Sequence, residues 1–328
     1  MTNLDSRAAQ TLRREIHNFY WGVWSELGVS GWGRTHENWA IDPEPLIIFS
    51  PSVIATEPRL RDEVIDWCSD YWRHVSAVRL RNLLNNNENQ QTDTWGQFAA
   101  TVNRYSGAAK WPRASVERRF ARTGRSSLRP LSDPSMIYLR MRSVFGLSAR
   151  TEVLRYLLFT RERSTAAMLA VQANYTKRNV AEACESLAQA GVLQPKQLGN
   201  RLYFSLVDAP ALSAFLGPSA YLHADWPALL RVVNALFDWG HFATHSEDRV
   251  LMVETHRLFD GIQEDLETLK LEAPDHVTGT EFLPIWRRWS VRLMKALAAG
   301  EWPANISGAA VRPTNPSRSS ASTRRKAG

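Results

Sequence analysis

The chain of 328 residues has only two cysteines and no long hydrophobic run. Cys68 and Cys184 each lie among apolar residues at helical spacing, so we interpret both as reduced core residues and expect no disulfide. Reduced cysteines are typical of the cytoplasm. No stretch reaches the roughly 18 apolar residues of a membrane span, and the N-terminal stretch MTNLDSRAAQTLRREIH is too charged for a secretory signal. We therefore expect a cytoplasmic protein with no membrane partner.

Motifs of the common enzyme classes are also missing. The chain contains no GxGxxG after a strand, no GxxxxGK[ST], no HExxH and no paired CxxC. His241 and His245 are four residues apart, with Asp248 beyond them, and could share a metal on a helix, but Gly240 and Thr244 favour a helix junction there. We predict neither an enzyme nor a bound metal or other cofactor.

Tryptophan, by contrast, is abundant, with 13 in the chain. So many indoles indicate either aromatic-rich cores or an apolar surface for a partner, and composition does not separate the two. Lysine and arginine total 40 against 33 acidic residues. The resulting charge of +7 is compatible with a polyanionic partner.

Helical periodicity dominates the sequence, and we predict a mainly α fold with one short β-hairpin. Residues 1–102 are predicted to form a helical, Trp-rich N-terminal domain. Helices are expected over residues 7–27, 59–84 with a break near residue 74, and 95–106, whereas LIIFSPSVI is either a buried strand or a helix and NNNENQQTDT is a polar loop.

Residues 103–133 are predicted to be a basic linker. Eight cations stand against Glu117 and Asp133 in this segment, namely Arg104, Lys110, Arg113, Arg118, Arg119, Arg122, Arg125 and Arg129. The segment is either a solvated connection or a connector that lies along the phosphates of a nucleic acid.

A C-terminal helical region over residues 211–299 carries two apolar stripes at helical spacing. The first consists of Trp226, Leu229, Val233 and Leu236, and the second of Trp286, Trp289, Leu293 and Leu297. Either stripe could pack into a core or form a homodimer interface. Residues 300–328 are rich in Ser, Pro, Ala and Arg, and we predict a disordered basic tail.

The segment 134–210 has the most informative order of elements. A first helix is expected from Ala149, a second with Ser164 as its N-cap, and a third with Thr176 as its N-cap, closed by Gly191. The alternating run RLYFSLV then pairs with VLQPKQ around a turn at Leu198–Asn200.

This order, and the phrase RNVAEACESLAQAGVL joined to the hairpin GNRLYF, resembles the winged helix-turn-helix domain of ArsR- and MarR-like bacterial transcription regulators. The resemblance covers about 60 residues, 148–207. It implies that the third helix enters the major groove of double-stranded DNA, and that the hairpin, or wing, approaches the backbone or minor groove.

The candidate DNA contacts lie at the start of the third helix and on the wing. They are Thr176, Lys177, Arg178, Asn179 and Glu182, followed by Lys196, Asn200 and Arg201. A helix N-terminus offers free N–H groups and partial positive charge to a phosphate or a guanine edge. Asn179 suits adenine, whereas Glu182 would either accept from a cytosine amino group or repel the backbone.

The sequence thus predicts a DNA-binding transcriptional regulator, a repressor, that acts as a homodimer. The alternative is a protein-interaction or antitoxin-like module, in which these charges form a solvated face and the N-terminal domain binds a protein partner. The N-terminal stretch HENWAIDPEPLIIFSPSVI and the helix that follows it are similar to uncharacterised bacterial regulators found beside nucleotidyltransferase toxins.

Overall fold

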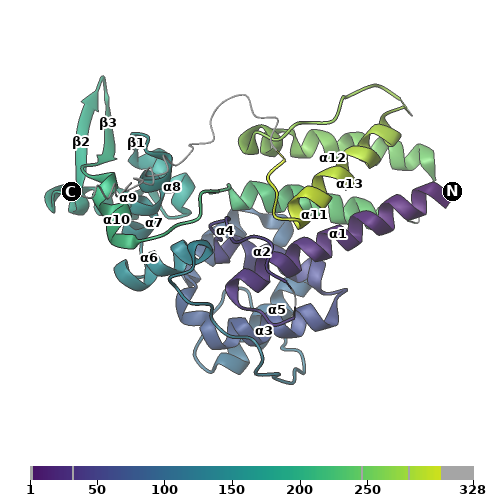
Figure 1. Cartoon of the computed structure of the whole chain (residues 1–328), viewed down its shortest axis with the longest axis horizontal. Helices are drawn as coiled ribbons and strands as arrows, with labels where there is room; N and C mark the ends of the chain where they lie inside the picture. The colour runs from purple at the N-terminus through teal and green to yellow at the C-terminus, as the bar shows by residue number, and fades with distance from the viewer. Residues whose placement is uncertain (1–2, 32, 245–246, 280, 304–328) are drawn as a thin grey trace, which may run out of the picture.

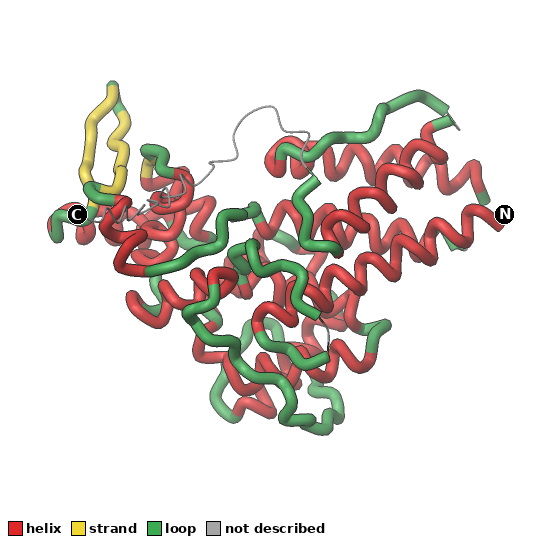
Figure 2. Tube along the Cα trace, in the orientation of Figure 1, coloured by secondary structure: helices red, strands yellow, loops and turns green. Residues whose placement is uncertain are grey.

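A computed structural model describes residues 3–31, 33–244, 247–279 and 281–303 of the chain. Helices make up most of these residues, with one small antiparallel sheet at one end of the molecule (Figure 2). The predicted mainly α fold is therefore confirmed. None of the helices in the described ranges combines the length and apolar character that crossing a membrane requires.

Five helices build the N-terminal part of the molecule. They are α1 (Asn3–Leu27), α2 (Pro43–Ile54), α3 (Pro58–Tyr71), α4 (Ala77–Asn86) and α5 (Asp93–Ser106). The break expected near residue 74 is a single 3₁₀ turn, Trp72–His74, before α4. LIIFSPSVI is helical in α2, where nearly every residue is buried, which explains why the sequence shows no polar face there.

Residues 107–133 pack against this helical part. Trp111 and Phe120 are buried, and Arg125 pairs with Glu63 of α3 at 2.6 Å. The segment also passes over the end of α1, where Gly28 has a φ of 107° and an added Cβ would lie 1.7 Å from the Ser127 carbonyl oxygen. Arg122 likewise pairs with Asp66 of α3, so acids of this helix compensate two of the eight cations.

Three helices and three strands follow after α6 (Ile137–Phe145). They are α7 (Ala149–Thr160), β1 (Ser164–Thr165), α8 (Ala166–Ala173), α9 (Lys177–Gln189), β2 (Leu193–Leu198) and β3 (Arg201–Leu206). The sheet is antiparallel in the order β1-β3-β2. Figure 1 shows the β2–β3 hairpin projecting from the rest of the molecule.

The N-cap of α8 differs from the prediction by one residue. Ser164 pairs with Phe204 in the sheet, and Thr165 caps the helix by accepting from the Met168 backbone N–H at 3.3 Å. The expectation for Ser164 was wrong because sequence spacing did not reveal the short strand β1, which fixes the backbone of Ser164 beside β3.

The C-terminal helices are α10 (Ala209–Leu216), α11 (Trp226–Phe242), α12 (Asp248–Leu269) and α13 (Phe282–Ala298). α1 packs against α11 and α13. The members of both predicted apolar stripes are buried within the chain, so they form core and offer no dimer interface. Residues 304–328 of the predicted basic tail lie outside the described residues.

The tryptophans are core residues in the same way. The structure describes 12 of the 13, and ten of these are buried, namely Trp21, Trp24, Trp39, Trp67, Trp95, Trp111, Trp226, Trp239, Trp286 and Trp289. Their abundance therefore reflects aromatic cores and not an apolar surface for a partner.

Candidate functional site

The start of α9 separates into a buried and an exposed face. Thr176 caps the helix as predicted, its Oγ1 accepting from the Asn179 backbone N–H at 3.3 Å. Thr176, Lys177, Arg178 and Asn179 are all exposed. The opposite face is core, and it includes Cys184, whose thiol is free and has its pKa raised by burial to about 12. Cys68 in α3 is likewise free and buried.

Glu182 lies one turn beyond Arg178 and pairs with it. The Arg178 Nε donates to a Glu182 carboxylate oxygen at 2.9 Å, and both side chains are exposed. This contact holds the guanidinium along the helix and offsets part of its charge. Lys177 consequently carries the least compensated charge at the start of α9.

The β2–β3 hairpin carries the other three candidate residues. Lys196 stands opposite Tyr203, and Asn200 and Arg201 lie at and just after the two-residue turn. All three are exposed. Gly199 allows this turn because its φ is 57°, a value that favours glycine. The hairpin therefore presents two cations and one amide near its free end.

The turn between α8 and α9 rests on α4, a contact that sequence reasoning missed. Tyr175 Oη lies 3.0 Å from Ser76 Oγ, and Asn82 Nδ2 donates to the Asn174 carbonyl at 2.9 Å. A groove of about 380 Å³ runs between α4 and α8 and ends beside Lys177, and Asn85 of α4 lies in its wall. About 90 residues separate the two sides in sequence, so no local pattern signals this contact.

A buried ionic cluster joins the N-terminal helices to α6 and α7. Its members are Asp42, Glu44, Arg79, Arg142, Glu152 and Arg155. Arg79 holds Asp42 through two 2.7 Å hydrogen bonds and also pairs with Glu44. Arg142 reaches Glu44 at 2.7 Å and Glu152 at 3.0 Å. Three guanidiniums thus face three carboxylates inside the molecule.

The cluster sets the charge of its acids. Burial alone would raise the pKa of Glu152, but Arg79, Arg142 and Arg155 lower that pKa to about 2. The same balance of burial against arginine charge holds the pKa of Asp42 below its usual range. Both carboxyls are therefore ionised at neutral pH, and each depends on the arginines around it.

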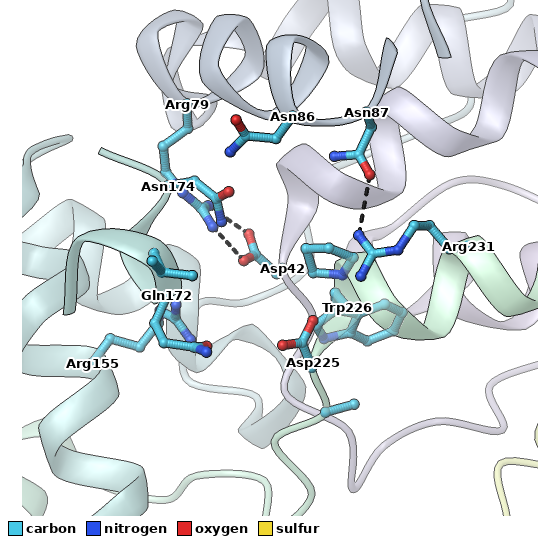
Figure 3. Close-up of a pocket in the computed structure, with 13 residues that line it drawn as sticks. Asp42, Arg79, Asn86, Asn87, Arg155, Gln172, Asn174, Asp225, Trp226 and Arg231 are labelled. Atoms are coloured by element: carbon cyan, nitrogen blue, oxygen red, sulfur yellow. Dashed lines mark hydrogen bonds and ion pairs between the residues drawn. The ribbon is translucent and has the colours of Figure 1, made fainter. Parts of the chain in front are cut away.

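A polar cavity of about 240 Å³ lies beside this cluster (Figure 3). It is enclosed by the C-terminal ends of α4 and α8 and by the N-terminal end of α11. Asp42 and Arg155 of the cluster line it, and Asp225 faces them from the start of α11. Sequence reasoning singled out none of these groups, because they come from segments far apart in the chain.

The metal-binding alternative gains nothing from the structure. Among the described residues, no three His, Cys, Asp or Glu side chains are grouped in a way that could hold a metal ion. His245, one of the two histidines of that alternative, lies outside the described residues.

Comparisons of the chain with protein-family models, with curated proteins and with solved structures gave no match.

Proposed function

We propose that residues 134–210 form a winged helix-turn-helix domain, whose characteristic helices and hairpin are α7 to β3, and that the protein is a sequence-specific DNA-binding transcriptional regulator, a repressor that acts as a homodimer. The order helix, strand, two helices and hairpin, with β3 between β1 and β2, supports this proposal. The observation that carries it is the exposed start of α9, where Lys177 and Arg178 stand on a helix whose other face is core.

In this proposal the first turn of α9 enters the major groove. Lys177 contacts a phosphate, Arg178 contacts a guanine edge or a phosphate, and Asn179 suits adenine. Glu182 positions Arg178 through their 2.9 Å hydrogen bond. On the wing, Lys196 and Arg201 approach the backbone, with Asn200 beside them at the tip.

The contact with α4 is compatible with DNA beside α9. Asn85 and Asn86 are exposed and line the groove next to Lys177. Amide side chains donate and accept hydrogen bonds and do not repel phosphates. The neighbouring wall therefore adds uncharged hydrogen-bonding groups at the edge of the proposed DNA surface.

The proposed homodimer needs a surface other than the buried stripes. An apolar α6–α10 surface is exposed around Val144, Leu147 and Phe215, and the Phe145 and Phe215 rings lie 6.4 Å apart across the two helices. A single winged helix reads few base pairs, and two-fold pairing extends the site. We assign the dimer contact to this α6–α10 surface.

The test is a gel-shift titration with the DNA upstream of the protein's own gene. The double variant Lys177→Gln, Arg178→Gln should bind more weakly. The plot of log K against log salt concentration should also become flatter, its negative slope losing about 1 in magnitude for each phosphate that the variant no longer neutralises. Arg257→Gln with Lys295→Gln is the matched control, because it removes one exposed arginine and one exposed lysine from α12 and α13. Equal binding by both double variants would show that α9 is not the contact helix.

The second candidate function is binding of a protein partner, as in an antitoxin-like module. The α6–α10 surface is compatible with this function, since an exposed apolar surface suits a different protein as well as a second copy. Recovery of one stoichiometric protein from a nuclease-treated host lysate, with no gel shift of upstream DNA, would favour this function over the first.

A further inference from the structure

The polar cavity beside the buried ionic cluster is lined by two acids, Asp42 and Asp225, and by three arginines, Arg79, Arg155 and Arg231. Asp42 is held by Arg79, and Arg231 is held by Asp265 at 2.6 Å, so these groups have partners. Asp225 makes one hydrogen bond among the described residues, to the Ala228 backbone N–H at 3.0 Å, where it caps α11. Its second carboxylate oxygen therefore faces the cavity with no hydrogen-bond partner in the described part of the chain.

Arg155 is the complementary group on the α7 side of the cavity. Its Nε donates to Glu152 at 2.7 Å, and its guanidinium lies 4.6 Å from the centre of the Tyr138 ring. These two contacts fix the plane of a largely buried guanidinium. An Arg fork held in this way suits a carboxylate.

The size and remaining lining of the cavity restrict what could occupy it. At roughly 30 Å³ per water, about 240 Å³ is the space of about eight waters, which is enough for a small amino acid together with some water. Gln172 and Asn174 of the α8 end and Asn86 of α4 add amide groups at the wall. The lining thus offers a cationic end, an anionic end and neutral hydrogen-bonding groups between them.

We propose that this cavity binds a small zwitterion of amino-acid size, with its ammonium at Asp225 and its carboxylate at Arg155. Asn86, Val171 and Asn174 line both this cavity and the groove beside Lys177. A bound zwitterion therefore fixes the end of α8 against α4, next to the start of α9, and changes DNA affinity. The coupling to DNA rests on the proposed function, whereas the binding of the zwitterion does not.

Isothermal titration calorimetry of the full chain tests the binding. The probes are the free amino acids, each compared with its amide and its N-acetyl derivative, which carry one charge instead of two. We expect at least one amino acid to bind and both of its single-charge derivatives to bind more weakly. Heat from no amino acid, or equal binding of the derivatives, would overturn the proposal.

Asp225→Asn is the decisive variant, because asparagine is also a good N-cap and the substitution removes only the charge. It should weaken binding by about tenfold to a hundredfold, the worth of a hydrogen bond to a charged group. Asp208→Asn is its matched control, since Asp208 caps α10 through the Ala211 N–H at 2.8 Å and does not line the cavity. Unchanged binding in Asp225→Asn, or equal losses in both variants, would place the ligand elsewhere.

Gel shifts with the zwitterion that binds best then test the coupling. DNA affinity should change when that zwitterion is added to the natural chain and should stay constant when it is added to Asp225→Asn. Because calorimetry involves no DNA, a failure of the proposed DNA function leaves the calorimetric result intact. Zwitterion binding with unchanged DNA affinity would refute the coupling alone.

Discussion

His36 is a buried imidazole that is held neutral. Its Nε2 lies 2.8 Å from the Leu297 carbonyl oxygen and its Nδ1 lies 2.8 Å from Thr35 Oγ1. Burial lowers the pKa of His36 to about 4, from about 6.5 in the unfolded chain. The side chain thus connects the loop after α1 to the end of α13 without carrying charge at neutral pH.

This neutral state makes the stability of the protein depend on pH. Between about pH 6.5 and pH 4, His36 is protonated in the unfolded chain but stays neutral in the folded chain. Because the unfolded chain then binds more protons, the free energy of unfolding should fall as the pH drops through this range. The contribution of one such group is at most about 1.4 kcal/mol per pH unit. Urea titrations at a series of pH values should show a shallower fall for His36→Gln. Identical pH slopes in the variant and the natural chain would contradict this account.

At the same scale, the sequence predicted residues whose role is local. Thr176 was expected to cap its helix and does so, because a cap depends on the three residues that follow it. That Asp225 and Arg155 line the same cavity could not be predicted from the sequence, since the two residues lie far apart in the chain, at the start of α11 and in α7.

The helices themselves were largely predictable, whereas the contacts between them were not. The end of α1 at Gly28, the break before α4 and the turn at Gly199–Asn200 all follow local patterns, and the structure confirms them. The docking of the α8–α9 turn on α4 depends on hydrogen bonds between distant segments, and neither side shows a pattern of its own.

Among the contacts between distant segments, the buried ionic cluster should cause the largest loss of stability when one of its members is removed. Arg142→Met leaves Glu44 and Glu152 with less compensation inside the molecule, and the loss of one partner of a buried pair costs about 3–5 kcal/mol. Urea unfolding followed by circular dichroism measures the change in stability. The control is Arg14→Met, which breaks the exposed pair with Glu15 and should cost less than about 1 kcal/mol. Similar effects in the two variants would show that the cluster contributes no more than a surface pair.

For the whole molecule, the apolar pattern predicted a hydrophobic core, but it did not show whether one chain or two chains together bury all of its apolar residues. The two stripes of the C-terminal region were interpreted as core, with a dimer interface as the alternative, and the packing of α1 against α11 and α13 shows how one chain buries them. Residues 107–133 were similarly ambiguous, because arginine pairs with α3 cannot be distinguished in sequence from contacts with phosphates.

Pairing of two chains through the α6–α10 surface should depend on Phe215. This side chain is 68% exposed, and Phe215→Ser should shift the protein from dimer to monomer in light scattering coupled to size-exclusion chromatography. Val253→Ser is the control, because Val253 is 62% exposed on α12, away from that surface. A dimer that persists in Phe215→Ser, or a monomer in the natural chain, would contradict the assignment.

The buried ionic cluster also limits which parts of the chain can be joined to another protein by gene fusion. Asp42, Glu44 and Arg79 come from the N-terminal helices, whereas Arg142, Glu152 and Arg155 come from α6 and α7. A gene fusion that inherited only α6 to β3 would carry two arginines and one glutamate without their former partners, on a face that had been interior. We therefore expect the segment from α6 to β3 to be inherited together with the N-terminal part that supplies Asp42, Glu44 and Arg79.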